Sequence, residues 1–156
     1  MENDKLHFIK NGMFLLLNNV SADAKARWGK MNAQQMIEHV IGFFNVSIEK
    51  LKFDLVTPEE HLPKYKEFLF SDKEFRENTK APAAVLGEEP LPINYPSLSV
   101  AIEKLQEAVE NFIRYFKNEP GRKTLHPVFG MLNFEEWVLL HYKHVMHHLR
   151  QFELVV

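Results

Sequence analysis

Four segments of the chain repeat apolar residues at the three- and four-residue spacing of an amphipathic helix. Two of them open with capping-box sequences, in which Asn32 precedes Gln35 and Asn133 precedes Glu136 by three positions. We predict helices over residues 5–18, 32–53, 97–117 and 133–152. Because four long helices with mostly short connections are typical of one architecture, the pattern predicts an all-α, four-helix-bundle fold.

A long irregular stretch, residues 54–96, separates the second and third predicted helices and holds six of the eight prolines. We expect an ordered, proline-rich crossover with an extended path around residues 81–95. The sequence Thr57-Pro58 followed by two glutamates predicts a short helix, and residues 71–74 are a candidate start for another. No segment of the chain shows a convincing strand pattern.

The composition is that of one ordinary folded domain, which we place at residues 1–156. Hydrophobic residues make up 46% and charged residues 26%, and the net charge of −2 gives no basic excess to indicate a nucleic-acid partner. The N-terminus lacks the features of a signal peptide, and no apolar run is long enough for a membrane span. We therefore expect a cytoplasmic protein without membrane contact.

The chain has no cysteine and eight histidines. The lack of cysteine excludes disulfides, thiolate metal sites and a cysteine nucleophile. Four of the histidines fall within eight residues of the last predicted helix: His141, His144, His147 and His148. Of these, His144 and His148 lie one turn apart on the inward face, where both imidazoles can reach one ion.

A buried imidazole pair needs partners, and a divalent metal supplies one for the unprotonated nitrogens. His39 on the second predicted helix lies at a matching depth if the second and fourth helices run antiparallel. Three neutral nitrogen ligands suit Zn²⁺ or Ni²⁺ first, then Fe²⁺ or Mn²⁺, with one or more positions left for water or substrate. The alternative is that these histidines are hydrogen-bonded core residues.

Two further histidines have open roles. His141 shares the inward face but lies one turn away from His144. It is either a hydrogen-bonded core or pocket residue or, less favoured, a ligand. His126 precedes a proline in a loop. It is either a pocket residue or a turn anchor beside Phe129 and Gly130, and we favour the anchor.

Gln35 lies one turn before His39, and Gln151 lies three residues after His148. Each could orient a metal ligand or a bound water, or could cap a polar patch. His147 projects toward the edge of the inward face and is the least favoured ligand of its group. Glu38 projects away from that face and is predicted to lie on a solvated surface.

Two sequence blocks carry a resemblance to a known family. The segments WGKMNAQQMIEHV (28–40) and HYKHVMHHLRQF (141–152) resemble the DinB/YfiT-like superfamily of four-helix bundles. In that superfamily one histidine of the second helix and an H-x-x-x-H pair of the last hold a divalent metal, which implies His39, His144 and His148. The frequent H-x-x-H-H-x-x-Q pattern is matched in full, ending at Gln151. The segment HPVFGMLNFEEW (126–137) is similar to an uncharacterised DinB-like subfamily with an H-P-x-F-G-x-L signature.

The resemblance implies two kinds of activity. Some members resemble metal-dependent S-transferases that use a low-molecular-weight thiol such as bacillithiol, mycothiol or glutathione, and others are described as metal-dependent hydrolases by analogy. The sequence identifies no catalytic residue, and no H-E-x-x-H or E-x-x-H motif is present. We expect a small-molecule substrate, and a homodimer is compatible with the aromatic crossover. The competing reading is a non-catalytic ligand-binding bundle with a structural metal or none.

Overall fold

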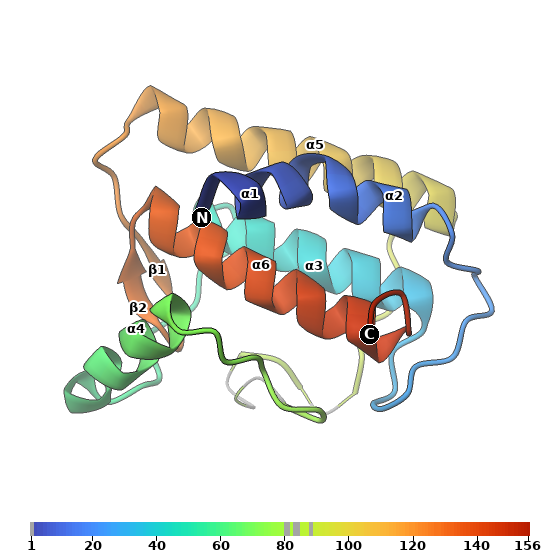
Figure 1. The fold of residues 1–156 in the computed structure, drawn as a ribbon, viewed down its shortest axis with the longest axis horizontal. Helices are drawn as coiled ribbons and strands as arrows, with labels where there is room; N and C mark the ends of the chain where they lie inside the picture. The colour runs from blue at the N-terminus through green and yellow to red at the C-terminus, as the bar shows by residue number, and fades with distance from the viewer. Residues whose placement is uncertain (1, 80–81, 83–84, 88) are drawn as a thin grey trace.

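The structure is a computed structural model that describes residues 2–79, 82, 85–87 and 89–156. It is mostly helical, with a small two-stranded sheet (Figure 1). In chain order the elements are α1 (Glu2–His7), a π-helical turn (Phe8–Gly12), α2 (Met13–Leu17), α3 (Ala33–Ser47), a 3-10 turn (Glu59–His61), α4 (Leu62–Phe70), α5 (Leu98–Asn118), β1 (Thr124–His126), β2 (Gly130–Leu132) and α6 (Phe134–Gln151).

The N-terminal segment from α1 to α2 runs as one continuous helical rod. His7 and Gly12, at the two junctions, both keep right-handed helical φ and ψ angles of −59° and −42°. A Cβ atom at position 12 would lie 2.7 Å from the Phe8 ring. Glycine at this position therefore avoids a clash with the ring. The helical periodicity predicted this rod, and the π-helical turn inside it is a finding of the structure.

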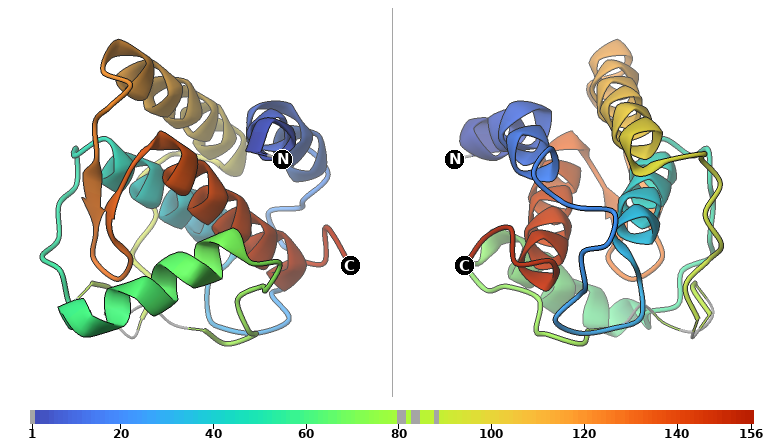
Figure 2. Two further views of the ribbon diagram at one scale, coloured as in Figure 1. Left: turned by 60° about the vertical axis from the view of Figure 1, so that its left-hand side comes forward. Right: turned by 90° about the vertical axis from the view of Figure 1, so that its right-hand side faces the viewer.

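The N-terminal rod, α3, α5 and α6 lie side by side (Figures 1 and 2). Each contributes a stripe of buried apolar residues to one core, and each fully buried aliphatic or aromatic side chain contributes about 1.5–3 kcal/mol. The largest fully buried side chains include Ile9, Met13, Leu17, Phe44, Leu105, Phe112, Phe116 and Trp137. The predicted helical segments therefore pack through the faces that the periodicity assigned to the core.

Helix α3 ends at Ser47, six residues before the predicted end at residue 53. The amide of Lys50 donates to the Asn45 carbonyl at 2.9 Å, and the amide of Glu49 donates to the Val46 carbonyl at 3.1 Å. These two bonds form a Schellman motif, whose reversal requires the left-handed φ of 63° found at Glu49. Leu51 extended the apolar pattern past the true end and is 43% exposed.

The described part of the crossover contains one regular α-helix, and its start differs from the prediction. Residues 59–61 form a 3-10 turn, and α4 begins at Leu62 with Pro63 in its first turn. Residues 71–74 form no helix, and the Lys143 ammonium donates there to the backbone carbonyls of Ser71 (2.8 Å) and Lys73. Part of the predicted extended path over 81–95 lies outside the described residues, and the described remainder has no regular helix or strand.

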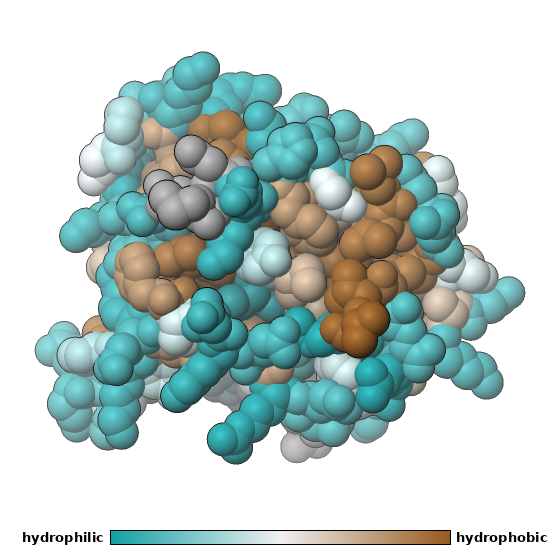
Figure 3. Space-filling view, viewed as in Figure 1, coloured by the Kyte–Doolittle hydropathy of each residue, from teal (hydrophilic) through white to brown (hydrophobic). Residues whose placement is uncertain are grey.

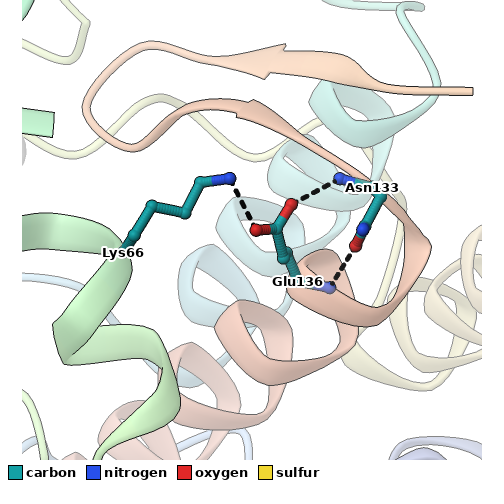
Figure 4. Close-up of polar contacts among 3 residues, drawn as sticks. All are labelled: Lys66, Asn133 and Glu136. Carbon is teal, nitrogen blue, oxygen red and sulfur yellow. Dashed lines mark hydrogen bonds and ion pairs between the residues drawn. The ribbon is translucent and has the colours of Figure 1, made fainter. Parts of the chain in front are cut away.

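Helix α4 is tied to the start of α6 by a charged contact (Figure 4). The Glu136 carboxylate accepts from the backbone amide of Asn133 at 2.9 Å, completing the predicted capping box, and pairs with Lys66 of α4 at 2.5 Å. Glu136 is 8% exposed, so the pair is shielded more than a surface ion pair. The contact fixes α4 outside the helical layers, beside the hairpin (Figure 2).

Strands β1 and β2 form an antiparallel hairpin, so the expectation of no strands is wrong. Leu125 pairs with Met131 at its centre. At the turn, Gly130 has a φ of 83°, a left-handed conformation that glycine adopts without a steric penalty. Thr124 fastens the hairpin to the core, because its hydroxyl donates to the Ser47 carbonyl (2.7 Å) and accepts from the Trp137 indole (2.8 Å).

One face of the molecule carries both polar and apolar side chains (Figure 3). None of the described helices is both long enough and apolar enough to span a membrane. On the face drawn in Figure 3, apolar side chains gather over α2 and the end of α6. Leu15, on α2, is 70% exposed.

Candidate metal centre

Helices α3 and α6 bring three histidines to one point. The Nε2 atom of His144 lies 2.9 Å from Nε2 of His39 and 3.1 Å from Nε2 of His148. One nitrogen of each residue lies within 4.8 Å of the other two, and this trio is the group of possible metal ligands found among the described residues. The structure thus brings together the three side chains that spacing, depth and facing had selected.

The two helices meet because they pack antiparallel (Figure 1). Capping boxes at Asn32 and Asn133 define where each helix begins. With these starts, His39 lies in the second turn of α3, and His144 and His148 lie one turn apart near the end of α6. The sequence separation of 105 residues between His39 and His144 is closed by this packing.

The centre is largely shielded from solvent. His148 is buried at 6% exposure, whereas His39 and His144 are intermediate. Burial lowers the pKa of His39 from 6.5 to about 4, with a further contribution from His147. Burial likewise holds the pKa values of His144 and His148 well below the usual range. All three rings are neutral at pH 7, which is the form that binds metal.

The donor set itself fits a cation. An imidazole nitrogen carries either one proton or one lone pair, so Nε2 of His144 can make one well-formed hydrogen bond but not two. It nevertheless faces two other Nε2 atoms at hydrogen-bond distance. Hydrogen bonds alone leave one of the contacts poorly satisfied, whereas a divalent cation accepts a lone pair from each ring.

The two candidate glutamines have different environments. Gln35 completes the capping box of α3 by accepting from the Asn32 amide at 2.9 Å, and its side-chain amide donates to the Leu91 carbonyl at 3.1 Å. The described hydrogen bonds of Gln35 therefore stabilise the start of α3 and hold the crossover against it, and they do not involve the three histidines. Gln151 instead contacts the centre, with its Oε1 2.7 Å from Nδ1 of His148.

His141 is part of the aromatic core. Its ring stacks on Phe44 at 3.9 Å with an interplanar angle of 15°, and on Trp137 at 5.2 Å. Burial lowers its pKa well below 6.5, and its Nε2 has no hydrogen-bond partner among the described residues. It lies outside the trio of possible ligands.

His126 anchors the turn of the hairpin. Its Nδ1 accepts from the backbone amides of Val128 (3.0 Å) and Phe129 (3.2 Å), and burial lowers its pKa to about 3. Its ring stacks on Phe43 at 5.7 Å, and Phe43 in turn contacts His39 and His144 edge-on at 5.2 Å. Phe43 therefore separates His126 from the centre. Phe43 was not identified from the sequence as a residue of the centre; its place in the helical pattern of apolar residues was the available signal.

Glu38 is not a solvated surface residue, contrary to the expectation from its projection. Its carboxylate accepts from the backbone amides of Asn94 (2.7 Å) and Tyr95 (3.2 Å). Gln34 donates to the same carboxylate and to the Tyr95 carbonyl. These bonds hold the end of the crossover against α3 beside His39, an arrangement that depends on backbone groups more than fifty residues away.

His147 packs beside the centre without joining the trio of possible ligands. Its ring lies 5.2 Å from Trp28 and 5.9 Å from Phe75, which places it between two loops. This position agrees with the prediction that His147 is the least favoured metal ligand of its group.

Comparison with known protein families gives one match that covers most of the chain. The family model described as the DinB superfamily matches residues 13–152, a range that includes α3, α6 and all three clustered histidines. A search of curated proteins gave no significant match. Because the family model covers most of the chain, the protein belongs to the DinB superfamily.

Proposed function

We propose that the protein is a metal-dependent enzyme whose divalent ion is held by His39, His144 and His148. The observation that supports the proposal is the convergence of three neutral imidazole nitrogens on one point. We interpret the four packed helical segments as the four-helix bundle of the resemblance, joined by a crossover between α3 and α5. Zn²⁺ or Ni²⁺ suits the all-nitrogen ligand set best.

A divalent metal with three neutral ligands would lower the pKa of a bound water or thiol and so supply a nucleophile near neutral pH. The chain's own residues provide the setting for that chemistry. Phe43 walls one side of the centre, and Glu38 holds the crossover beside His39. Since the chain has no cysteine, any reacting thiol arrives with a cosubstrate.

Two reactions remain candidates under this proposal: hydrolysis by an activated water, and transfer of a low-molecular-weight thiol to an electrophilic carbon. A non-catalytic binding role is the competing function, and one observation favours it. Among the described residues, the hydrogen-bond and ring contacts of the three histidines are with one another, Phe43, His147 and Gln151, and these contacts include no carboxylate that could act as a general base.

Metal analysis of the untagged protein tests the proposal. After loading with Zn²⁺ or Ni²⁺ and desalting, the wild type should retain about one ion per chain. His144→Ala should retain almost none, because two ligands make a weak site. The matched control His147→Ala removes a neighbouring histidine and should still bind. A metal-free wild type, or a His144→Ala variant that retains metal, would contradict the proposal.

The two reactions are separated by thiol binding. Glutathione and cysteine are offered to the metal-loaded protein while a chelator removes the ion. A thiol cosubstrate that binds the metal should slow its removal, and a serine analogue of the same thiol should not. Equal removal rates with thiol and serine analogue would favour hydrolysis over thiol transfer.

A further inference from the structure

Gln151, the last residue of α6, lies between His148 and the loop that precedes α3. Its Oε1 atom lies 2.7 Å from Nδ1 of His148, and its Nε2 donates to the Trp28 carbonyl at 2.9 Å. The residue is 3% exposed, so water does not compete freely for these bonds. The oxygen and the nitrogen of the side-chain amide thus each have a hydrogen-bond partner.

These partners determine which nitrogen of His148 carries the proton. A backbone carbonyl only accepts, so the NH₂ group of Gln151 must face Trp28 and the amide oxygen must face His148. An amide oxygen also only accepts, so Nδ1 of His148 must be the donor. In a neutral ring the lone pair then lies on Nε2, the atom that faces His144.

The loop that supplies the Trp28 carbonyl is itself fixed on α6. The Arg27 amide donates to the backbone carbonyl of Gln151 at 2.8 Å. Gly29 has a φ of +77°, which favours glycine, and a side chain there would crowd Nε2 of Gln151 at 3.0 Å. The chain then enters α3, which carries His39. The same contacts therefore tie the two helices that carry the clustered histidines.

We propose that Gln151 is a positioning residue which, together with the Trp28 carbonyl, holds His148 in the tautomer protonated at Nδ1. The loop at residues 27–29 supplies no metal ligand itself. Through Gln151 and His148 it nevertheless affects how tightly the centre binds metal. Metal ligands generally depend on such partners at the opposite ring nitrogen. This inference rests on the proposed metal site for its consequence, but the tautomer exists without metal.

The test replaces Gln151 with methionine, which has a similar shape and cannot make the two hydrogen bonds. Histidine-labelled, metal-free protein is studied by NMR, where ring carbon and nitrogen shifts distinguish the two tautomers of His148. We expect the Nδ1–H form in the wild type and a mixture in Gln151→Met. The Kd for Zn²⁺ should rise about 10- to 100-fold in the variant.

Two further variants complete the test. Gln35→Met removes the glutamine that caps α3, so it controls for lost stability and should leave the His148 tautomer and the Zn²⁺ Kd unchanged. Gly29→Ala leaves every histidine and glutamine in place and should raise the Kd by displacing the Gln151 amide.

An Nε2–H tautomer in the wild type, or an unchanged tautomer in folded Gln151→Met, would overturn the inference, as would an unchanged Zn²⁺ Kd in both folded Gln151→Met and folded Gly29→Ala. A wild type that binds no Zn²⁺ would instead defeat the proposed function and the claim about affinity, while the NMR result would still decide the tautomer.

Discussion

The imidazole of His144 lies between those of His39 and His148, with Nε2–Nε2 distances of 2.9 and 3.1 Å. In a metal-free protein this placement costs folding free energy. Three imidazole rings are removed from water, and their protons can form only part of the hydrogen bonds that the two Nε2–Nε2 contacts require. The arrangement is explained if the rings are retained to bind an ion.

Replacing His144 with leucine should separate metal binding from stability. In the presence of a chelator, His144→Leu should unfold at the same or a higher temperature than the wild type, because an incompletely satisfied polar group is replaced by an apolar one. Zn²⁺ at a hundred times its Kd should stabilise the wild type by about 2.7 kcal/mol. The variant should gain nothing.

Thermal unfolding with and without Zn²⁺ measures both effects. A large loss of stability in the chelated variant would show that the histidines are structural residues of the core, which is the competing explanation. A Zn²⁺-dependent gain in the variant would place the ion elsewhere.

The stability of the metal-free protein should fall in acid, and His126 should account for part of the fall. Its pKa is lowered by burial from 6.5 to about 3, so between these values the unfolded chain binds a proton that the folded chain does not. Above pH 6.5 both states are neutral and the residue has no effect. At pH 4.5 it should cost about 2–3 kcal/mol.

His126→Asn isolates this contribution. Asparagine offers an oxygen near the position of Nδ1, which accepts from the two turn amides, but it does not titrate. Urea unfolding at pH 7.5 and 4.5 should show a smaller loss for this variant than for the wild type. His61→Asn makes the same substitution at an exposed position and serves as the matched control. Equal losses in His126→Asn and the wild type would contradict the assignment.

Two glutamates occupy left-handed positions where glycine is usual. Glu49 (φ 63°) ends α3, and Glu153 (φ 58°) ends α6. Glu153→Gly should raise the free energy of unfolding by about 0.5–1 kcal/mol, because glycine adopts this conformation freely and the carboxylate loses an exposed contact with Arg27 at 4.0 Å.

Glu49→Gly should gain less, since it loses the 2.7 Å hydrogen bond from the Tyr115 hydroxyl. Chemical denaturation of the two variants in parallel gives the comparison. A larger gain at Glu49 than at Glu153 would mean that the Tyr115 contact contributes nothing.

Glu38→Ala should release the end of the crossover from α3. The two backbone amides that its carboxylate accepts from, at Asn94 and Tyr95, should lose protection in hydrogen exchange, and stability should fall by about 1–3 kcal/mol. Glu110→Ala, at an exposed position on α5, is the control for removing one negative charge. Unchanged exchange at Asn94 and Tyr95 would show that other contacts hold the segment.

The helices and the three clustered histidines could be predicted because both depend on local periodicity. Spacing along α6 put His144 and His148 on one face, and depth selected His39. The end of α3 was missed because its Schellman motif carries Glu49 rather than glycine. The hairpin was missed because each strand has three residues, too few for an alternating pattern, and is held by side chains such as Thr124. The role of Glu38 depends on distant backbone groups and leaves no mark in the sequence.

The clustered histidines come from α3 and from the end of α6. During synthesis, a chain that has emerged only as far as α5 holds one of the three, and the full set forms only after the final helix docks. If the set holds a metal ion as proposed, occupancy by that ion would indicate that folding is complete. Conversely, any motion that parts α3 from α6 removes His39 from the set, so the rate at which the ion escapes would measure how often these two helices separate.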